Sequence, residues 1–161
     1  MTMPQYPPNM PHKVAAAGAL FLNEAGHVLL VNPTYKPVWE IPGGMVENFE
    51  APRAACIREV AEEIGLAIEP GPLLGLDYAA SQASGREVLR FIFWGGVLDA
   101  AQIAAIRLPA EELSEYGFFD LPTAKTLLSA KLGEQVGRIL AARERGETFV
   151  YTEHAITPAA K

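Results

Sequence analysis

Apolar and polar positions alternate in blocks along the chain, and the blocks predict several short strands. Two apolar runs, residues 14–22 and 27–31, are separated by a four-residue segment that ends in Gly26. This spacing predicts a β-hairpin with a short glycine-containing loop. Further runs with strand character occupy residues 73–80, 87–98, 116–119 and 148–151, and residues 81–85 connect the first two of these.

Helical periodicity is clearest in residues 51–64. Pro52 suits the first turn of a helix, where its missing N–H is not needed, and Gly65 is a typical C-terminal cap. Three further helical stretches are predicted at residues 102–106, 123–128 and 130–145. This order of elements predicts an α/β fold in which a mixed sheet is flanked by helices.

The chain shows no internal repeat, so we expect one domain over residues 13–161, preceded by an irregular arm over residues 1–12. The apolar run 14–22 raises the alternative of a secretory signal. It is too short to span a bilayer and has no small-residue cleavage pattern after it. We therefore expect a buried strand, no membrane association and a cytoplasmic location.

Composition and charge narrow the classes of partner. Half of the 161 residues are hydrophobic, a fifth are charged and the formal net charge is −6. An acidic chain is unsuited to extended nucleic acid, but a bound cation can still create a site for a small phosphorylated substrate. The single cysteine, Cys56, excludes an internal disulfide and a multi-cysteine metal site. We expect an unreactive thiol that packs within its helix.

Three carboxylates share one side of the helix at residues 51–64. At 100° per residue, Glu63 lies about 40° and Glu62 about 60° from Glu59 on either side. The apolar positions of the same helix are expected on a separate, core-facing arc. An acidic helix side is often only a solvated surface. Here, however, like charges repel at this spacing and crowd the C-terminal end of the helix, where the helix dipole disfavours them. A divalent cation bound by carboxylate oxygens would remove both costs.

The carboxylates belong to a longer pattern. Gly44 is followed after five residues by Glu50, and after seven more by residues 58–66, which read REVAEEIGL. This pattern resembles the Nudix box at every specified position from Gly44 to Leu66. The WEIPG segment at 39–43 and the aromatic strand with the following Leu-Pro at 116–122 also resemble the family.

Similarity to the Nudix family implies an α/β/α sandwich with a mixed sheet, in which the box forms a strand, a loop and a helix. It implies a Mg²⁺ or Mn²⁺ cofactor held by Glu59, Glu62 and Glu63, with the carbonyl of Gly43 as a further ligand. The implied catalytic set is Glu50, Arg58, Glu59, Glu62 and Glu63.

The implied roles differ within this set. Glu50 and Arg58 brace the loop against the helix, and either Glu62 or Glu63 is the general base. An acid outside the box often joins such sites, and Glu112 and Glu115 are the candidates; each is equally well explained as a surface residue. Gly44 has no side-chain role, because a larger residue would obstruct the turn.

Candidates for substrate binding are Tyr35, Trp39, Gly44 and Arg90. Tyr35, Trp39 and Tyr78 are aromatic residues that can stack on a base, with burial in the core as the alternative. Arg90 stands inside an apolar strand and therefore needs a partner, whether a phosphate or a carboxylate. Arg86 is a weaker candidate for phosphate binding.

The loop before Glu50 departs from many Nudix sequences, which have glycine immediately before this glutamate. Here the loop reads Asn48-Phe49-Glu50. We expect Asn48 to adopt any left-handed conformation that the loop needs. Phe49 is expected either to pack beneath the loop or to form a wall of the substrate pocket.

These inferences favour a metal-dependent hydrolase of a diphosphate linkage in a nucleoside diphosphate derivative, such as ADP-ribose or a nucleotide sugar. The alternatives are a nucleoside triphosphate pyrophosphohydrolase of the same family and a nucleotide-sensing module without turnover. An assembly role through the helix at 130–145, including a homodimer, is compatible with each.

Overall fold

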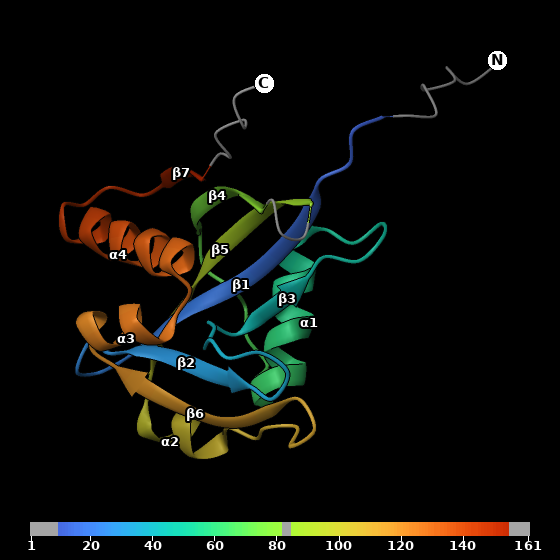
Figure 1. Cartoon of the computed structure of the whole chain (residues 1–161). Helices are drawn as coiled ribbons and strands as arrows, with labels where there is room; N and C mark the ends of the chain where they lie inside the picture. The colour runs from blue at the N-terminus through green and yellow to red at the C-terminus, as the bar shows by residue number, and fades with distance from the viewer. Residues whose placement is uncertain (1–9, 82–84, 155–161) are drawn as a thin grey trace.

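The computed structural model describes residues 10–81 and 85–154, which form one mixed sheet with helices on both faces (Figure 1). Six strands lie in the order β6-β2-β1-β5-β4-β7, and β3 pairs with β1 beside this row. The strands are β1 (Val14–Asn23), β2 (Val28–Pro33), β3 (Gly43–Met45), β4 (Leu73–Ser81), β5 (Arg86–Leu98), β6 (Leu113–Phe119) and β7 (Val150–His154).

The apolar run at the start of the domain forms the central strand β1, which pairs with β2 through the predicted hairpin and runs parallel to β5. The middle of β1, from Ala17 to Phe21, is buried, because helices cover both faces of the sheet here. A strand buried on both faces needs apolar residues at successive positions, which explains the unbroken run.

Four helices complete the fold: α1 (Pro52–Ile64), α2 (Ala100–Ala105), α3 (Leu121–Leu127) and α4 (Ala130–Glu144). Helix α1 covers one face, and α3 and α4 cover the other (Figure 1). The core is correspondingly divided into two clusters, one that contains Val60 and Ile64 of α1 and one that contains Leu132, Val136 and Ile139 of α4. The predicted α/β/α sandwich with a mixed sheet is confirmed.

Local signals placed most helix ends correctly. Helix α1 begins at Pro52, and Gly65 caps its C-terminus with a left-handed φ of 71°. Burial places Cys56 in the core and raises the pKa of its thiol to about 12, so it is the packing thiol that the sequence predicts. Strand β7 extends three residues beyond the predicted 148–151, because it pairs in parallel with the distant strand β4.

Two predictions concern residues that the structure describes only in part. The expected arm over residues 1–12 includes residues 1–9, and the expected loop over 81–85 includes residues 82–84, all outside the described residues. The division into an arm and a single domain stays a prediction. Within the described part of the chain, no helix is long and apolar enough to cross a membrane.

Candidate active site

Two adjacent glycines allow the box strand to pass very close to its neighbours. A Cβ on Gly43 would lie 2.5 Å from the carbonyl oxygen of Ala17, and Gly43 has a φ of 153°. A Cβ on Gly44 would lie 2.5 Å from the Oε2 atom of Glu59. The absent side chains therefore let β3 contact β1 on one side and a carboxylate of α1 on the other.

The buried face of α1 differs from the one expected from its periodicity. Its buried residues are Ala55, Cys56, Val60 and Ile64, which lie between about −40° and 140° when Glu59 is set at zero. Glu59 and Glu63 fall inside this arc, whereas Ala54 and Ala61, which were expected in the core, are exposed. The prediction of separate acidic and core-facing arcs is wrong. Glycines in β3 leave space for carboxylates where a helix normally packs apolar side chains.

Arg58 organises the acids around this helix. Its Nε and one terminal nitrogen each donate to a Glu50 oxygen at 2.9 Å, and the second terminal nitrogen donates to Glu59 at 2.8 Å and Glu62 at 3.2 Å. It also donates to the carbonyl of Met45 at 3.0 Å. A bidentate pair of this kind fixes both side chains. Arg58 and Glu50 thus connect the loop to the helix, in the arrangement that the family resemblance implies.

Glu63 has the most strongly altered acidity of the three helix carboxylates. Its Oε2 atom accepts a hydrogen bond from the N–H of Gly43 at 2.8 Å. Burial raises its pKa to about 8, and the nearby carboxylates of Glu59 and Glu40 act in the same direction. Burial also raises the pKa of Glu59, although Arg58 opposes this. Carboxyl groups that are costly to ionise alone are suited to a bound cation.

Each helix carboxylate is directed at a protein partner. Glu59 and Glu62 contact Arg58, and Glu63 contacts Gly43. In residues 10–81 and 85–154, no three His, Cys, Asp or Glu side chains already converge in a cluster that could hold a metal ion. Of the two acids that contact Arg58, Glu62 has the more accessible side chain, which is 57% exposed against 16% for Glu59.

The loop before Glu50 differs from both expectations. Phe49, not Asn48, has the left-handed conformation, with a φ of 63°, and it is the one such non-glycine residue in the described ranges. Its side chain is fully exposed, so it neither packs beneath the loop nor lines the pocket described below. A left-handed backbone at this position explains why glycine suits it in related sequences.

Phe49→Gly removes the strain of the left-handed backbone, which stabilises the fold, but it also raises the entropy of the unfolded chain, which opposes this gain. We expect a net stabilisation of roughly 0.5–1 kcal/mol. Thermal unfolding should show a melting temperature higher by about 2–4 °C per kcal/mol. Phe49→Ala is the control, because alanine keeps the strain. An equal increase in this control would attribute the gain to removal of the exposed ring.

Acid unfolding should report on the brace between Glu50 and Arg58. Hydrogen bonds from Arg58 lower the pKa of Glu50 to about 2. A lowered pKa stabilises the fold above the unfolded value of 4.5, and this stabilisation is lost as pH falls from 4.5 toward 2. Glu50→Gln should therefore be less stable than wild type in urea at pH 7, and the difference should shrink below pH 4.5 and become small only near pH 2. A constant difference across this range would contradict the assignment.

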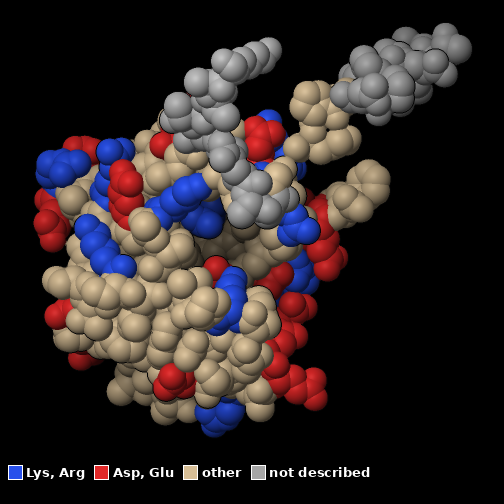
Figure 2. Space-filling model, in the orientation of Figure 1, with Lys and Arg blue, Asp and Glu red and all other residues tan. Residues whose placement is uncertain are grey.

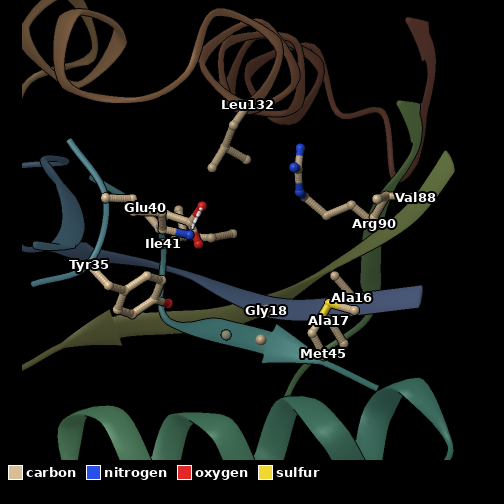
Figure 3. Close-up of a pocket in the computed structure, with 13 residues that line it drawn as sticks. Ala16, Ala17, Gly18, Tyr35, Glu40, Ile41, Met45, Val88, Arg90 and Leu132 are labelled. Atoms are coloured by element: carbon tan, nitrogen blue, oxygen red, sulfur yellow. Dashed lines mark ion pairs between the residues drawn. The ribbon is translucent and has the colours of Figure 1, made fainter. Parts of the chain in front are cut away.

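A pocket of about 240 Å³ lies on the opposite side of β3 from α1 (Figure 3). Tyr35 and Glu40 lie at one end, Arg90 lies at the other, and Leu132 of α4 covers it (Figure 3). Its walls are formed by Ala16, Ala17, Gly18, Tyr35, Lys36, Glu40, Ile41, Gly43, Gly44, Met45, Val88, Arg90 and Leu132. Figure 2 shows a hollow near the middle of the same face, with basic atoms on its rim and acidic atoms gathered toward α1. The two box glycines thus separate the pocket from the acidic helix.

The structure divides the aromatic candidates for substrate binding. Tyr35 lines the pocket and is 71% exposed, which leaves its ring available to a ligand. Trp39 packs edge-to-face on Phe119 at 5.2 Å between ring centroids, and it is absent from the pocket wall. Tyr78 donates to Glu87 and is also outside the pocket. The packing alternative is therefore favoured for Trp39.

The charged candidates also differ in whether they lie at the pocket. Arg90 lines the pocket and pairs with buried Asp77, whereas Arg86 is exposed at the start of β5 and outside the pocket. Glu115 accepts from the amide of Asn32 on the surface, and the carbonyl of Glu112 accepts from Thr34. Neither acid has a contact with a box side chain in the described residues.

Among the charged residues of the pocket, Lys36 and Glu40 were missed from the sequence, and so was Asp77, the buried partner of Arg90. Lys36 and Glu40 form an i,i+4 ion pair at 2.6 Å inside the pocket wall, although they lie in an irregular segment where spacing carries no helical meaning. Asp77 interrupts an apolar strand and is completely buried. Its position in an apolar run was the available signal, since a buried acid requires partners.

Comparison with known proteins agrees with this geometry. The family profile of the NUDIX domain matches residues 12–142. A MutT-like protein of Streptomyces ambofaciens is 32% identical over 118 residues, covering 71% of this chain and 76% of that protein. An 8-oxo-dGDP phosphatase of Mus musculus is 36% identical over 93 residues, which cover 53% of this chain but only 27% of that protein. A crystal structure of a MutT protein from Methanosarcina mazei has a TM-score of 0.70 at 25% identity and covers 82% of this chain and 96% of that one.

The match of the NUDIX domain extends over most of the chain and includes the complete box, α1 and the strands that carry the pocket. Together with the similarity to MutT-like proteins in sequence and in fold, it identifies the chain as a member of the Nudix hydrolase family.

Proposed function

We propose that this protein is a Mg²⁺- or Mn²⁺-dependent hydrolase that cleaves a diphosphate linkage in a nucleoside diphosphate derivative, such as ADP-ribose or a nucleotide sugar. The observation that carries the proposal is the pair of partly buried carboxylates, Glu59 and Glu63, held against the Gly43–Gly44 strand of a complete Nudix box. Burial raises the pKa of both carboxyl groups, so ionising them costs free energy that a bound cation would offset.

The donor set suits a hard divalent cation. Carboxylate and carbonyl oxygens are the ligands that Mg²⁺ and Mn²⁺ favour. Glu59, Glu62 and Glu63 would hold the ion, with the carbonyl of Gly43 as a further ligand. The raised pKa of Glu63 fits this assignment, because a cation would offset the cost of its ionisation. When bound, the ion neutralises phosphate oxygens and lowers the pKa of a bound water.

The protein residues have separate tasks in this proposal. Arg58 and Glu50 fix the helix relative to the loop, so that the carboxylates keep their positions. Glu62 or Glu63 takes the proton of the attacking water. Glu63 is oriented by Gly43, whereas Glu62 is exposed to solvent. The pocket beyond the two glycines holds the part of the substrate that does not react.

The pocket favours a diphosphate derivative over a triphosphate. Its walls are mainly apolar, with Tyr35 at one end, as expected for a base or sugar. It contains two cationic side chains, Lys36 and Arg90, and each already has a carboxylate partner, Glu40 and Asp77 respectively. The pocket therefore has little net positive charge to offset the additional negative charge of a triphosphate.

A second candidate is a nucleoside triphosphate pyrophosphohydrolase of the same family. It is favoured by the similarity to the mouse 8-oxo-dGDP phosphatase, whose named substrate is likewise a nucleotide with no group beyond its phosphates. A nucleotide-sensing role without turnover is less well supported, since such modules commonly lose box acids that this chain retains. The cytoplasmic location and a homodimer stay predictions.

A substrate panel tests the proposal. Purified protein with Mg²⁺ or Mn²⁺ is incubated with ADP-ribose, nucleotide sugars and nucleoside triphosphates, and the products are separated by ion-exchange chromatography. Two monophosphate products from a diphosphate derivative are expected. Release of pyrophosphate from triphosphates alone would support the second candidate, and no metal-dependent product from any compound would support the sensing role.

A further inference from the structure

The Arg90 end of the pocket continues into a row of polar side chains that crosses three strands. Cα pairing places Ala16 of β1 beside Arg90 of β5, Arg90 beside Asp77 of β4, and Asp77 beside Thr152 of β7. Residues paired in this way point to the same face of a sheet. Three polar side chains thus follow one another beneath α4, within a face that is otherwise apolar.

Asp77 is the centre of this row. It is completely buried, and its Oδ1 atom accepts from the Thr152 hydroxyl at 2.5 Å and lies 2.8 Å from Nδ1 of His154. Its Oδ2 atom is the one directed at Arg90, at 3.5 Å. The other nitrogen of His154 lies 3.0 Å from Glu134 of α4. One carboxylate oxygen is therefore held by β7, and the other remains for Arg90.

Arg90 is only partly committed to this partner. In the described ranges Asp77 is its one hydrogen-bond partner, and a separation of 3.5 Å is long for such a bond. A guanidinium has five N–H donors. Its remaining donors lie at the pocket, where Figure 3 shows the side chain projecting toward Leu132. A planar fork of this kind suits a ligand group with two adjacent acceptor atoms.

The layer above the row also has unused hydrogen-bonding capacity. Gln135 of α4 is completely buried, and neither its amide oxygen nor its nitrogen has a partner among the residues described. Lys131, four residues before Gln135, donates to the carbonyl of Ala80 at the end of β4. Ile139, four residues after Gln135, lies over Gly75 near the start of the same strand. Gln135 therefore lies over the part of β4 that contains Asp77.

We infer that Asp77 is a positioning residue that, held by Thr152 and His154, orients Arg90 to bind an acceptor pair on the substrate at the end of the pocket opposite Tyr35 and Glu40. The acceptor pair is offered either by a purine edge or by a phosphate. Strand β7 thereby becomes part of substrate recognition. The inference deepens the proposed function and uses the same pocket.

The test is a double-mutant cycle on ligand affinity. In Asp77→Asn the amide oxygen replaces Oδ1 as the acceptor from Thr152, so the NH₂ group faces Arg90, donor against donor. We expect Asp77→Asn and Arg90→Met each to raise Kd about tenfold, and the double variant to equal Arg90→Met alone. The matched control, Glu134→Gln, changes an acid that contacts His154 but not Arg90, and should leave Kd unchanged.

Calorimetric titration in EDTA uses adenosine, guanosine, AMP, GMP and inorganic pyrophosphate, so that turnover plays no part. If Arg90→Met weakens the binding of a nucleoside, Arg90 contacts the base. If it weakens the binding of phosphate-bearing probes alone, Arg90 contacts a phosphate. Binding in EDTA with a failed substrate panel would reject the proposed function and leave the inference intact.

Three results would overturn the inference. The first is that the wild type binds no probe. The second is that the fold-changes in Kd of Asp77→Asn and Arg90→Met multiply in the double variant, and the third is that Glu134→Gln raises Kd as much as Asp77→Asn does. Where a substrate is found, Asp77→Asn should raise KM with kcat within about twofold, because the lost contact is equal in the ground and transition states. Global destabilisation would instead lower kcat through a reduced fraction of folded protein.

Discussion

Glu63→Gln is expected to lower kcat/KM by about 10²–10⁴-fold, the range for loss of a general base or metal ligand at a hydrolytic site. Glutamine keeps the size of the side chain and an oxygen that can accept from the Gly43 N–H. It cannot carry the negative charge that a cation requires. The fold should survive, because the neutral amide avoids the cost of ionising a buried carboxyl whose pKa is raised to about 8.

The control for this variant is Glu69→Gln, which removes a carboxylate that is 85% exposed and lies 4.0 Å from Arg53. Its kcat/KM should equal that of the wild type. Thermal unfolding of both variants in EDTA would show whether Glu63→Gln remains folded. Full activity in a folded Glu63→Gln protein would remove this residue from the chemistry, and the assignment of base or ligand would pass to Glu62.

Gly44→Ala is expected to lower kcat/KM by about 10²-fold through displacement of Glu59. The new Cβ would lie 2.5–2.6 Å from the carboxyl oxygens of Glu59, so this side chain must move. A displacement of about 1 Å of a catalytic group is enough for an effect of this size. Because the nearest atoms belong to the end of a side chain, the fold should be retained.

Two glycine variants serve as comparisons for Gly44→Ala. In Gly133→Ala the added Cβ meets Lys125 at 3.4 Å, an ordinary contact, and activity should be unchanged. In Gly43→Ala the added Cβ meets the backbone of Ala17 and Gly18, so stability should fall together with activity. Steady-state kinetics and urea unfolding on the same preparations separate the two effects. Wild-type activity in Gly44→Ala would show that Glu59 need not occupy its present position.

The sequence predicted those features that depend on local rules. Pro52 and Gly65 marked the ends of α1 because one lacks an N–H and the other tolerates a left-handed backbone. The spacing from Gly44 to Leu66 identified the acids and Arg58 as one unit, and the structure places them together. Tyr35 and Arg90, two of the candidates for substrate binding, line one pocket, and their substrate contacts stay predictions.

The errors arose where distant segments decide the outcome. Periodicity assigned alanines to the core of α1 and acids to its outer side, but it carries no information on the glycines of β3 that admit Glu59 and Glu63. Phe49 took the left-handed position expected for Asn48, in a loop whose end is held to the helix by the contact between Glu50 and Arg58. The partnership of Asp77 with Thr152 depends on pairing between β4 and β7, which are far apart in sequence.

The central claim is that the acidic face of α1 binds the divalent cation on which hydrolysis depends. The most direct test is titration of the EDTA-dialysed protein with Mn²⁺, followed by electron paramagnetic resonance of the free ion, for wild type and for the variant Glu59→Gln/Glu62→Gln/Glu63→Gln. Stoichiometric binding by the wild type and its loss in the folded variant are predicted. Equal Mn²⁺ binding by the two proteins, or none by the wild type with or without a nucleotide, would contradict the claim.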